Sequence, residues 1–148
     1  MIKRIVIILT LILLAGCGFS PIHSKKNNNN YSIELVNYSG ERDLNNFLRI
    51  NLMQYKNQSE NKFFIEIESE YTKNTFTKDT TGKITNYELI AEVKFILKNK
   101  NKKIEFTEKK IMETMDDNFE QNKYERSIKQ NFASSLINKL ISSLNIIQ

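Results

Sequence analysis

Two long segments of the chain alternate apolar and polar residues, which predicts two β-strands with one dry face each. The first covers residues 63–71 and the second residues 87–98. Shorter alternating segments at 32–37 and 103–107 predict two further strands. Between the two long strands, the polar and threonine-rich stretch 73–86 predicts a long hairpin connection. The two long strands are therefore expected to be antiparallel neighbours.

Two other segments carry apolar residues at spacings of three and four, which predicts two amphipathic α-helices. We expect Asp43 to cap a first helix that ends near Tyr55. A long second helix is expected from Phe119 or Gln121 to about Leu144. The apolar residues of the first helix, mostly at these spacings, are Leu44, Phe47, Leu48, Ile50, Leu52 and Met53. The apolar stripe of the second helix comprises Ile128, Phe132, Ala133, Leu136, Ile137, Leu140, Ile141 and Leu144.

The order of these elements is strand, helix, strand, strand, strand, helix, which predicts an α+β fold. Each helix has one apolar stripe to bury, and the sheet has one apolar face to cover. The expected architecture is a two-layer sandwich, with a four-stranded, mostly antiparallel sheet and both helices on one face. The other face carries Glu66, Glu68 and Glu70 opposite lysines, and we interpret it as a solvated face. Whether Lys109 to Asn118 is strand or loop stays open, because apolar residues break the alternation there.

The start of the chain is typical of a bacterial lipoprotein signal. Lys3 and Arg4 precede the short apolar run 5–14, and the motif Leu-Ala-Gly-Cys ends at Cys17. A membrane-spanning helix needs about twenty apolar residues, twice what this run offers. An ordinary secretory signal would need no cysteine at this position. We therefore expect a diacylglycerol on the thiol of Cys17, which makes this residue the lipidation site.

This signal divides the chain into three parts. Residues 1–16 are expected to be removed as a signal peptide, and residues 17–30 to form an acylated, flexible tether rich in asparagine and lysine. Residues 31–148 are expected to form a single α+β domain. Gly18 stands where an aspartate would favour retention in the inner membrane, so the expected location is the outer membrane, with the lipid anchor on its periplasmic side.

Composition argues against several classes of function. The chain has 22 basic and 17 acidic residues, a formal net charge of +5, and removal of the signal with its two basic residues lowers this charge to +3. A positive charge this small and this dispersed does not make a nucleic-acid-binding surface. His23 is the only histidine and Cys17 the only cysteine, so no catalytic triad, disulfide or zinc-type metal cluster can be assembled. We expect a binding or structural protein without a cofactor or metal. An enzyme would have to use carboxylates such as Glu66, Glu68 and Glu92.

Several features, taken in order, resemble the lipopolysaccharide-assembly lipoprotein family (LptE). The start of the family is similar to Leu-Ala-Gly-Cys-Gly-Phe at 14–19, with Pro21 soon after. Its polar loop and the following strand resemble the segment 71–97, in which Lys78 and Gly82 precede Tyr-Glu-Leu. Its closing helix resembles the segment 124–144. The likeness covers nearly the whole mature chain.

The resemblance implies a function and two partners. Members of this family plug the lumen of a large outer-membrane β-barrel (LptD), help to assemble it, and bind lipopolysaccharide on its way to the outer leaflet. The positions that match the family's basic residues are Lys78 and Lys109 or Lys110, which are the candidate lipopolysaccharide-binding residues. An alternative is a generic envelope scaffold lipoprotein that makes no lipopolysaccharide contact.

Overall fold

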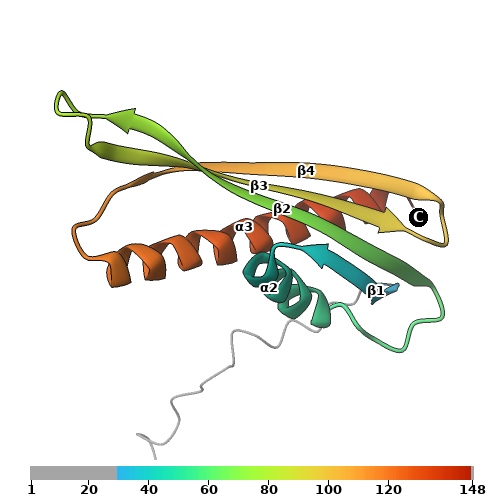
Figure 1. Cartoon of the computed structure of the whole chain (residues 1–148). Helices are drawn as coiled ribbons and strands as arrows, with labels where there is room; N and C mark the ends of the chain where they lie inside the picture. Colours follow the sequence, from blue (N-terminus) through green and yellow to red (C-terminus); the bar gives the residue numbers. More distant parts are fainter. Residues whose placement is uncertain (1–29, 148) are drawn as a thin grey trace, which may run out of the picture.

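Four strands form one twisted sheet, and two helices cover one of its faces (Figure 1). The computed structural model describes residues 30–147. The predicted signal peptide 1–16, the lipidation site Cys17 and the tether up to residue 29 lie outside the described residues. The elements follow the order β1 (Ser32–Gly40), α2 (Arg42–Met53), β2 (Lys62–Lys78), β3 (Ile84–Leu97), β4 (Lys102–Glu113) and α3 (Asn118–Ile147).

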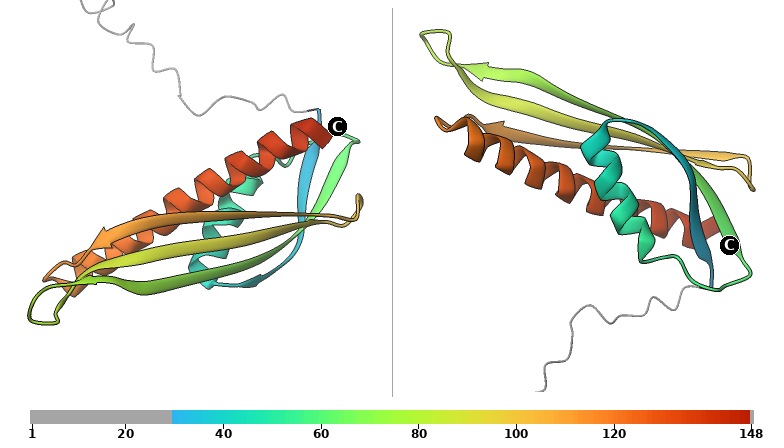
Figure 2. Two further views of the ribbon diagram at one scale, coloured as in Figure 1. Left: turned by 90° about the horizontal axis from the view of Figure 1, so that it is seen from above. Right: turned by 60° about the horizontal axis from the view of Figure 1, so that its bottom comes forward.

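The strands lie in the order β1-β2-β3-β4, so spatial order follows chain order. β1 pairs with β2 in parallel, and α2 makes the crossover between them. β2 and β3 pair antiparallel, as do β3 and β4. Figure 2 shows both helices on the same side of this sheet. The predicted fold class, a two-layer α+β sandwich with a mostly antiparallel sheet, is confirmed.

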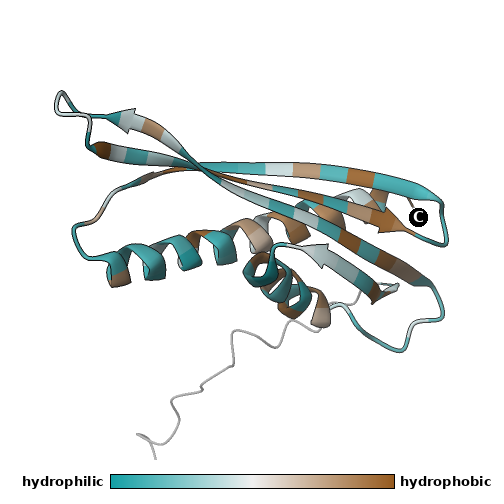
Figure 3. Ribbon diagram, viewed as in Figure 1, coloured by the Kyte–Doolittle hydropathy of each residue, from teal (hydrophilic) through white to brown (hydrophobic). Residues whose placement is uncertain are grey.

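The core lies between the inner face of the sheet and the apolar stripes of the two helices. Alternation along the strands places apolar side chains inward, and Figure 3 shows this alternation as changing hydropathy along each strand. Tyr31 packs edge-on against Phe63 with ring centroids 5.2 Å apart, and Phe95 lies 6.2 Å from Phe106. The helices contribute Leu44, Leu48, Leu52, Ile128, Phe132, Ala133, Leu136, Ile137, Leu140 and Leu144.

The hairpin between β2 and β3 differs from the prediction. The sequence predicts a long connection over 73–86, which is wrong: β2 continues to Lys78, β3 begins at Ile84, and only 79–83 form the loop. Threonine is β-branched and favours strands, and the hydroxyls of Thr77 and Thr85 lie 2.6 Å apart across the pair. The hairpin therefore extends the sheet, and the first half of α3 runs alongside it (Figure 1).

The segment 109–118, left open by the sequence, divides into strand and turn. β4 continues to Glu113, and α3 begins at Asn118. Asp117 caps α3, because its Oδ1 accepts hydrogen bonds from the N–H groups of Phe119 (2.7 Å) and Glu120 (3.4 Å). Asp117 is thus the residue at which the turn ends and the helix starts.

The predicted cap of the first helix is wrong by two residues. The N-cap of α2 is Glu41, whose side chain accepts a hydrogen bond from the N–H of Leu44, while Asp43 lies in the first turn. Asp43 still favours the helix through its charge near the positive end of the dipole. Within residues 30–147, no helix combines the length and the apolarity that crossing a membrane requires.

Candidate functional site

The three lysines expected to bind lipopolysaccharide are all exposed, but they do not gather in one place. Lys78 ends β2 beside the hairpin loop, whereas Lys109 and Lys110 lie within β4. Among residues 30–147, none of the three forms an ion pair, so each ammonium is available to an anionic ligand. Lys78 is aligned with Ile84 of β3, and Lys109 with Ile90, which separates them by roughly 20 Å along the strand.

Lys109 and Lys110 project from opposite faces of the sheet, because successive strand residues alternate. Lys109 shares the outer face with Glu105, which is aligned with Lys94. Lys110 shares the inner face with the buried Met112, and its Nζ lies 5.7 Å from the ring centroid of Tyr124 in α3. A single ligand on one face can therefore contact only one of these two lysines.

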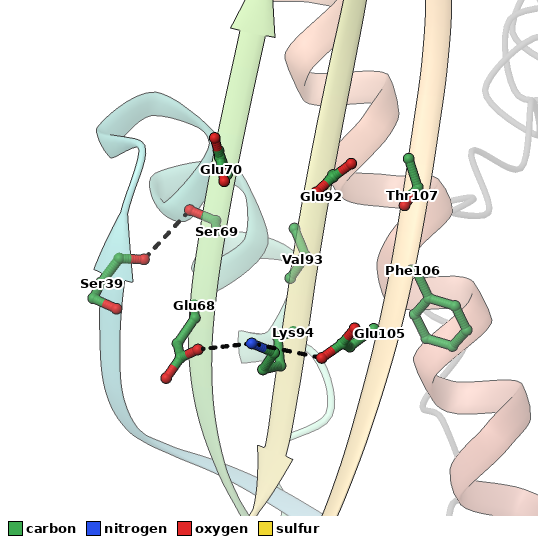
Figure 4. A pocket seen from close by; sticks show the side chains of 10 residues that line it. All are labelled: Ser39, Glu68, Ser69, Glu70, Glu92, Val93, Lys94, Glu105, Phe106 and Thr107. Carbon is green, nitrogen blue, oxygen red and sulfur yellow. Dashed lines mark hydrogen bonds and ion pairs between the residues drawn. The ribbon is translucent and has the colours of Figure 1, made fainter.

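The outer face carries a lattice of charges centred on Lys94. Its Nζ lies 3.3 Å from Glu68 of β2 and 3.5 Å from Glu105 of β4, and Figure 4 shows the three side chains aligned across the strands. Hydrogen bonding to Glu68 and the neighbouring carboxylates raise the pKa of Lys94. Similarly, the side chain of Lys98 lowers the pKa of Glu66. Both shifts favour the charged forms, as in solvated ion pairs.

A shallow hollow of about 320 Å³ lies over this lattice. Glu70 and Glu92 face each other there across β2 and β3, in a pairing of like charges that costs stability (Figure 4). Among residues 30–147, no group of three or more His, Cys, Asp and Glu side chains is arranged to hold a metal ion. The interpretation of this face as solvated agrees with the ion pairs of Glu66 with Lys98 and of Glu68 with Lys94. No ion pair of Glu70 is found among the described residues.

A partly buried polar cluster, missed by the sequence analysis, joins the sheet to the first half of α3. We call Glu41, Tyr71, Lys73, Glu125 and Lys129 the Tyr71 cluster. The hydroxyl of Tyr71 donates to Glu125 (2.9 Å), and Lys73 donates to the other oxygen of the same carboxylate (2.7 Å). Lys129 lies 4.2 Å from the Tyr71 ring centroid and 3.0 Å from Glu41.

Burial, and then the bond to Glu125, raise the pKa of Tyr71, so this phenol stays protonated and keeps donating. The cluster ties β2, α2 and α3 together where the sheet extends beyond the apolar core. A second polar contact fixes β4 to α3, because Glu108 accepts from Ser135 (2.5 Å) and pairs with Lys139 (2.7 Å). Together these contacts hold the long hairpin rigidly on α3.

The Tyr71 cluster predicts a loss of stability in acid. Burial alone would raise the pKa of Glu41, but hydrogen bonds from the Leu44 N–H and from Lys129 outweigh it and hold that pKa below its ordinary value of 4.5. Glu41 therefore contributes stability above pH 4.5, which is lost as the pH falls through the lower folded-state pKa. We expect the free energy of unfolding, measured in urea, to fall between about pH 5 and pH 3.

The variant Glu41→Gln keeps a cap oxygen but cannot carry the charge. Its unfolding free energy is expected to depend less steeply on pH over that range than the wild type. The matched control is Glu60→Gln, an exposed position outside the cluster, which should keep the wild-type slope. Equal slopes for both variants would remove Glu41 as a source of the acid sensitivity.

Comparisons with known proteins place the fold among solved lipoproteins. No model of a known protein family matches the chain, and no curated protein matches it significantly in sequence. The crystal structure of the rare lipoprotein B from Shewanella oneidensis superposes with a TM-score of 0.53 at 16% identity, covering 78% of this chain and 100% of that one. The solution structure of the uncharacterized lipoprotein B from Nitrosomonas europaea gives 0.51 at 12% identity, covering 75% and 82%.

The chain has the fold of these lipoproteins. At such low identity the likeness concerns the fold alone, and it covers about three quarters of the chain. It agrees with the expectation of a lipoprotein that the motif ending at Cys17 raised from the sequence. The assignments of Lys78, Lys109 and Lys110 to a glycolipid stay predictions.

Proposed function

We propose that the protein is an acylated outer-membrane lipoprotein that plugs and helps to assemble a β-barrel translocon and takes part in lipopolysaccharide transport to the outer leaflet. The observation that carries the proposal is the fold of solved lipoproteins in a chain that also bears Leu-Ala-Gly-Cys at 14–17. Acylation of Cys17 would hold the domain on the periplasmic side of the membrane.

The surface of the domain suits a plug in a polar lumen. Interiors of outer-membrane barrels are polar and wet, so an occupant needs a rigid body with a charged surface. The outer sheet face offers this through the ion pairs of Lys94 with Glu68 and Glu105. Rigidity comes from the core and from the Tyr71 cluster, which hold the sheet on the helices.

Mild crosslinking in the native envelope, followed by detergent extraction and mass spectrometry, tests the barrel partner. We expect a large outer-membrane β-barrel to be recovered with this protein in a ratio near one to one. Recovery of the protein alone, or with a soluble or inner-membrane complex, would contradict the plug. That second result would favour a generic envelope scaffold without lipopolysaccharide contact, for which the separation of the three candidate lysines is the supporting observation.

The lipopolysaccharide contact has its own prediction. Replacement of Lys78, Lys109 and Lys110 together by glutamate is expected to weaken lipopolysaccharide binding by about tenfold or more, because charged hydrogen bonds to phosphate are lost. Binding is measured with the acylated protein in detergent and labelled lipopolysaccharide. The matched control is Arg42→Glu, an exposed basic residue at the start of α2, which should leave binding unchanged.

The single variants then identify the face that binds. Loss of affinity in Lys109→Glu would place the glycolipid on the outer face of the sheet, and loss in Lys110→Glu would place it beside Tyr124 on the helix side. Unchanged affinity in the triple variant would show that none of the three residues belongs to the site. It would not bear on the proposed barrel partner, which the crosslinking experiment tests.

A further inference from the structure

The first described residue of the domain lies at the same end of the molecule as the turn between β3 and β4. The hydroxyl of Ser59 donates to the carbonyl of Asn30 (2.8 Å), and Ser32 is aligned with Lys62 at the start of β2. The amide of Asn99, in the β3–β4 turn, donates to the carbonyl of Lys62 (2.6 Å). Both views of Figure 2 show the starts of β1 and β2 and the β3–β4 turn at the same end of the molecule. The tether therefore joins the domain beside this turn.

This end of the domain is strongly basic. Among the residues that the structure describes, three acids lie there, Glu34, Glu60 and Glu66, and two of them are paired, Glu34 with Lys62 (2.7 Å) and Glu66 with Lys98. We call its six lysines the basic end: Lys56, Lys62, Lys98, Lys100, Lys102 and Lys103.

Four of the six lysines in the basic end have no internal counter-charge. Among residues 30–147, Lys56, Lys100, Lys102 and Lys103 form no ion pair, whereas eight other lysines do, and only two of those eight, Lys62 and Lys98, belong to the basic end. Asn101, with a φ of 47°, makes the tight turn that holds Lys100, Lys102 and Lys103 close together. Their positive charge is therefore concentrated on one exposed tip.

The opposite end of the domain has the reverse balance. The hairpin loop 79–83 and the start of α3 meet there, since Lys83 lies 3.6 Å from Asp116. Five acids outnumber three lysines at that end: Asp79, Glu113, Asp116, Asp117 and Glu120 against Lys78, Lys83 and Lys123. The domain thus has a charge asymmetry along its long axis, with the positive end where the tether enters.

We infer that the basic end docks on the anionic phospholipid headgroups of the membrane that holds the lipid anchor. This rests on the proposed acylation of Cys17. The tether 17–30 can reach about 45 Å if extended, so the anchor alone leaves the orientation of the domain free. Lysines within a Debye length of about 8 Å of an anionic surface add attraction, and here they select one orientation.

This orientation has a consequence for the proposed plug. When the basic end faces the headgroups, the hairpin loop 79–83 points away from them, because it lies at the other end of the sheet (Figure 1). Lys78 would then face the periplasm, away from the membrane surface. Docking of the basic end thus describes the domain on the membrane before it enters its partner, and entry into the lumen would require the basic end to leave the headgroups.

Lysine reactivity in reconstituted vesicles tests this docking. The full acylated chain is placed in vesicles of phosphatidylcholine alone or with three parts in ten of phosphatidylglycerol, and acetylation of each lysine is followed by mass spectrometry. We expect the reactivity of Lys100, Lys102 and Lys103 to fall about fivefold on the anionic vesicles and to recover in high salt. Lys78 and Lys83, at the far end, should react equally on both.

Two double variants make the test specific. Lys100→Glu with Lys102→Glu should abolish the protection of Lys56 and Lys103, whereas the matched control Lys83→Glu with Lys123→Glu should leave it intact. Equal reactivity of the basic end on both kinds of vesicle would overturn the inference, as would protection of Lys83 instead. Protection found only in native envelopes would also overturn it, by indicating an acidic protein partner.

The same spectra separate this inference from the proposed function. The mass of the amino-terminal peptide reports whether Cys17 carries acyl chains. An unmodified peptide would remove the anchor on which both proposals rest. An acylated peptide without protection of the basic end would overturn the orientation alone and leave the barrel partner to be judged by co-purification.

Discussion

Replacing Gly40 by alanine is expected to destabilise the domain by about 3 kcal/mol or more, a large part of the stability of a typical domain. Gly40 has a φ of +103°, in a region where side chains are strained. A Cβ atom there would lie 1.7 Å from the carbonyl oxygen of Ser69, which is backbone of β2 and cannot rotate away. The substitution therefore combines conformational strain with a clash in the sheet.

The junction around Gly40 has little freedom to relax. The N–H of Glu41 donates both to the carbonyl oxygen of Ser69 (3.3 Å) and to its hydroxyl (3.1 Å). The side chain of Asn45, which is 3% exposed, donates to the carbonyl of Ser39 (3.0 Å). Moving β1 away from β2 to admit a methyl group would break these bonds and displace the cap of α2.

Gly82→Ala provides the matched control for this prediction. Gly82 has a similar φ of +86°, but a Cβ there meets nothing within 4 Å. Gly82→Ala should therefore lower the free energy of unfolding only by the conformational strain, about 1–2 kcal/mol. Urea unfolding followed by circular dichroism measures both variants. Equal losses of unfolding free energy in the two variants would show that the clash with Ser69 adds nothing to the destabilisation by Gly40→Ala.

The fold could be predicted from the sequence where hydrophobic periodicity was strong. The inner-face positions of β3 and the stripe of α3 are buried as expected, from Leu89 to Leu97 and from Ile128 to Leu144. The extent of the β2–β3 hairpin could not be predicted, because 73–78 and 84–86 are strands without an apolar alternation. Pairing with the neighbouring strand, rather than burial, keeps those residues extended.

The candidate site was predictable only in part. Exposure of Lys78, Lys109 and Lys110 follows from their charge, but the faces of the latter two depend on whether 109–113 is strand, which the sequence left open. The Tyr71 cluster depends on contacts across more than fifty residues, such as that of Tyr71 with Glu125. The sequence did contain a signal for this cluster. Lys73 is a charged residue on the inner face of β2, and Glu125 is a charged residue on the side of α3 that faces it.

Replacing Cys17 by alanine is expected to have the largest effect on location. Without the thiol no diacylglycerol can be attached, and the peptide before residue 17 should stay on the chain. Whole-protein mass spectrometry should find a precursor that retains residues 1–16 and carries no acyl chain. Fractionation should find it absent from the outer membrane, because stable attachment needs more than one acyl chain and this variant has none.

A second variant separates the anchor from the function of the domain. Exchanging residues 1–17 for an ordinary cleavable secretory signal should release residues 18–148 into the periplasm as a soluble protein. Recovery of the barrel with this form should fall by about a hundredfold, since the tether no longer raises the local concentration of the domain. Outer-membrane recovery of Cys17→Ala at the wild-type level would contradict the lipid anchor. It would then leave docking through the protein surface as the means of attachment.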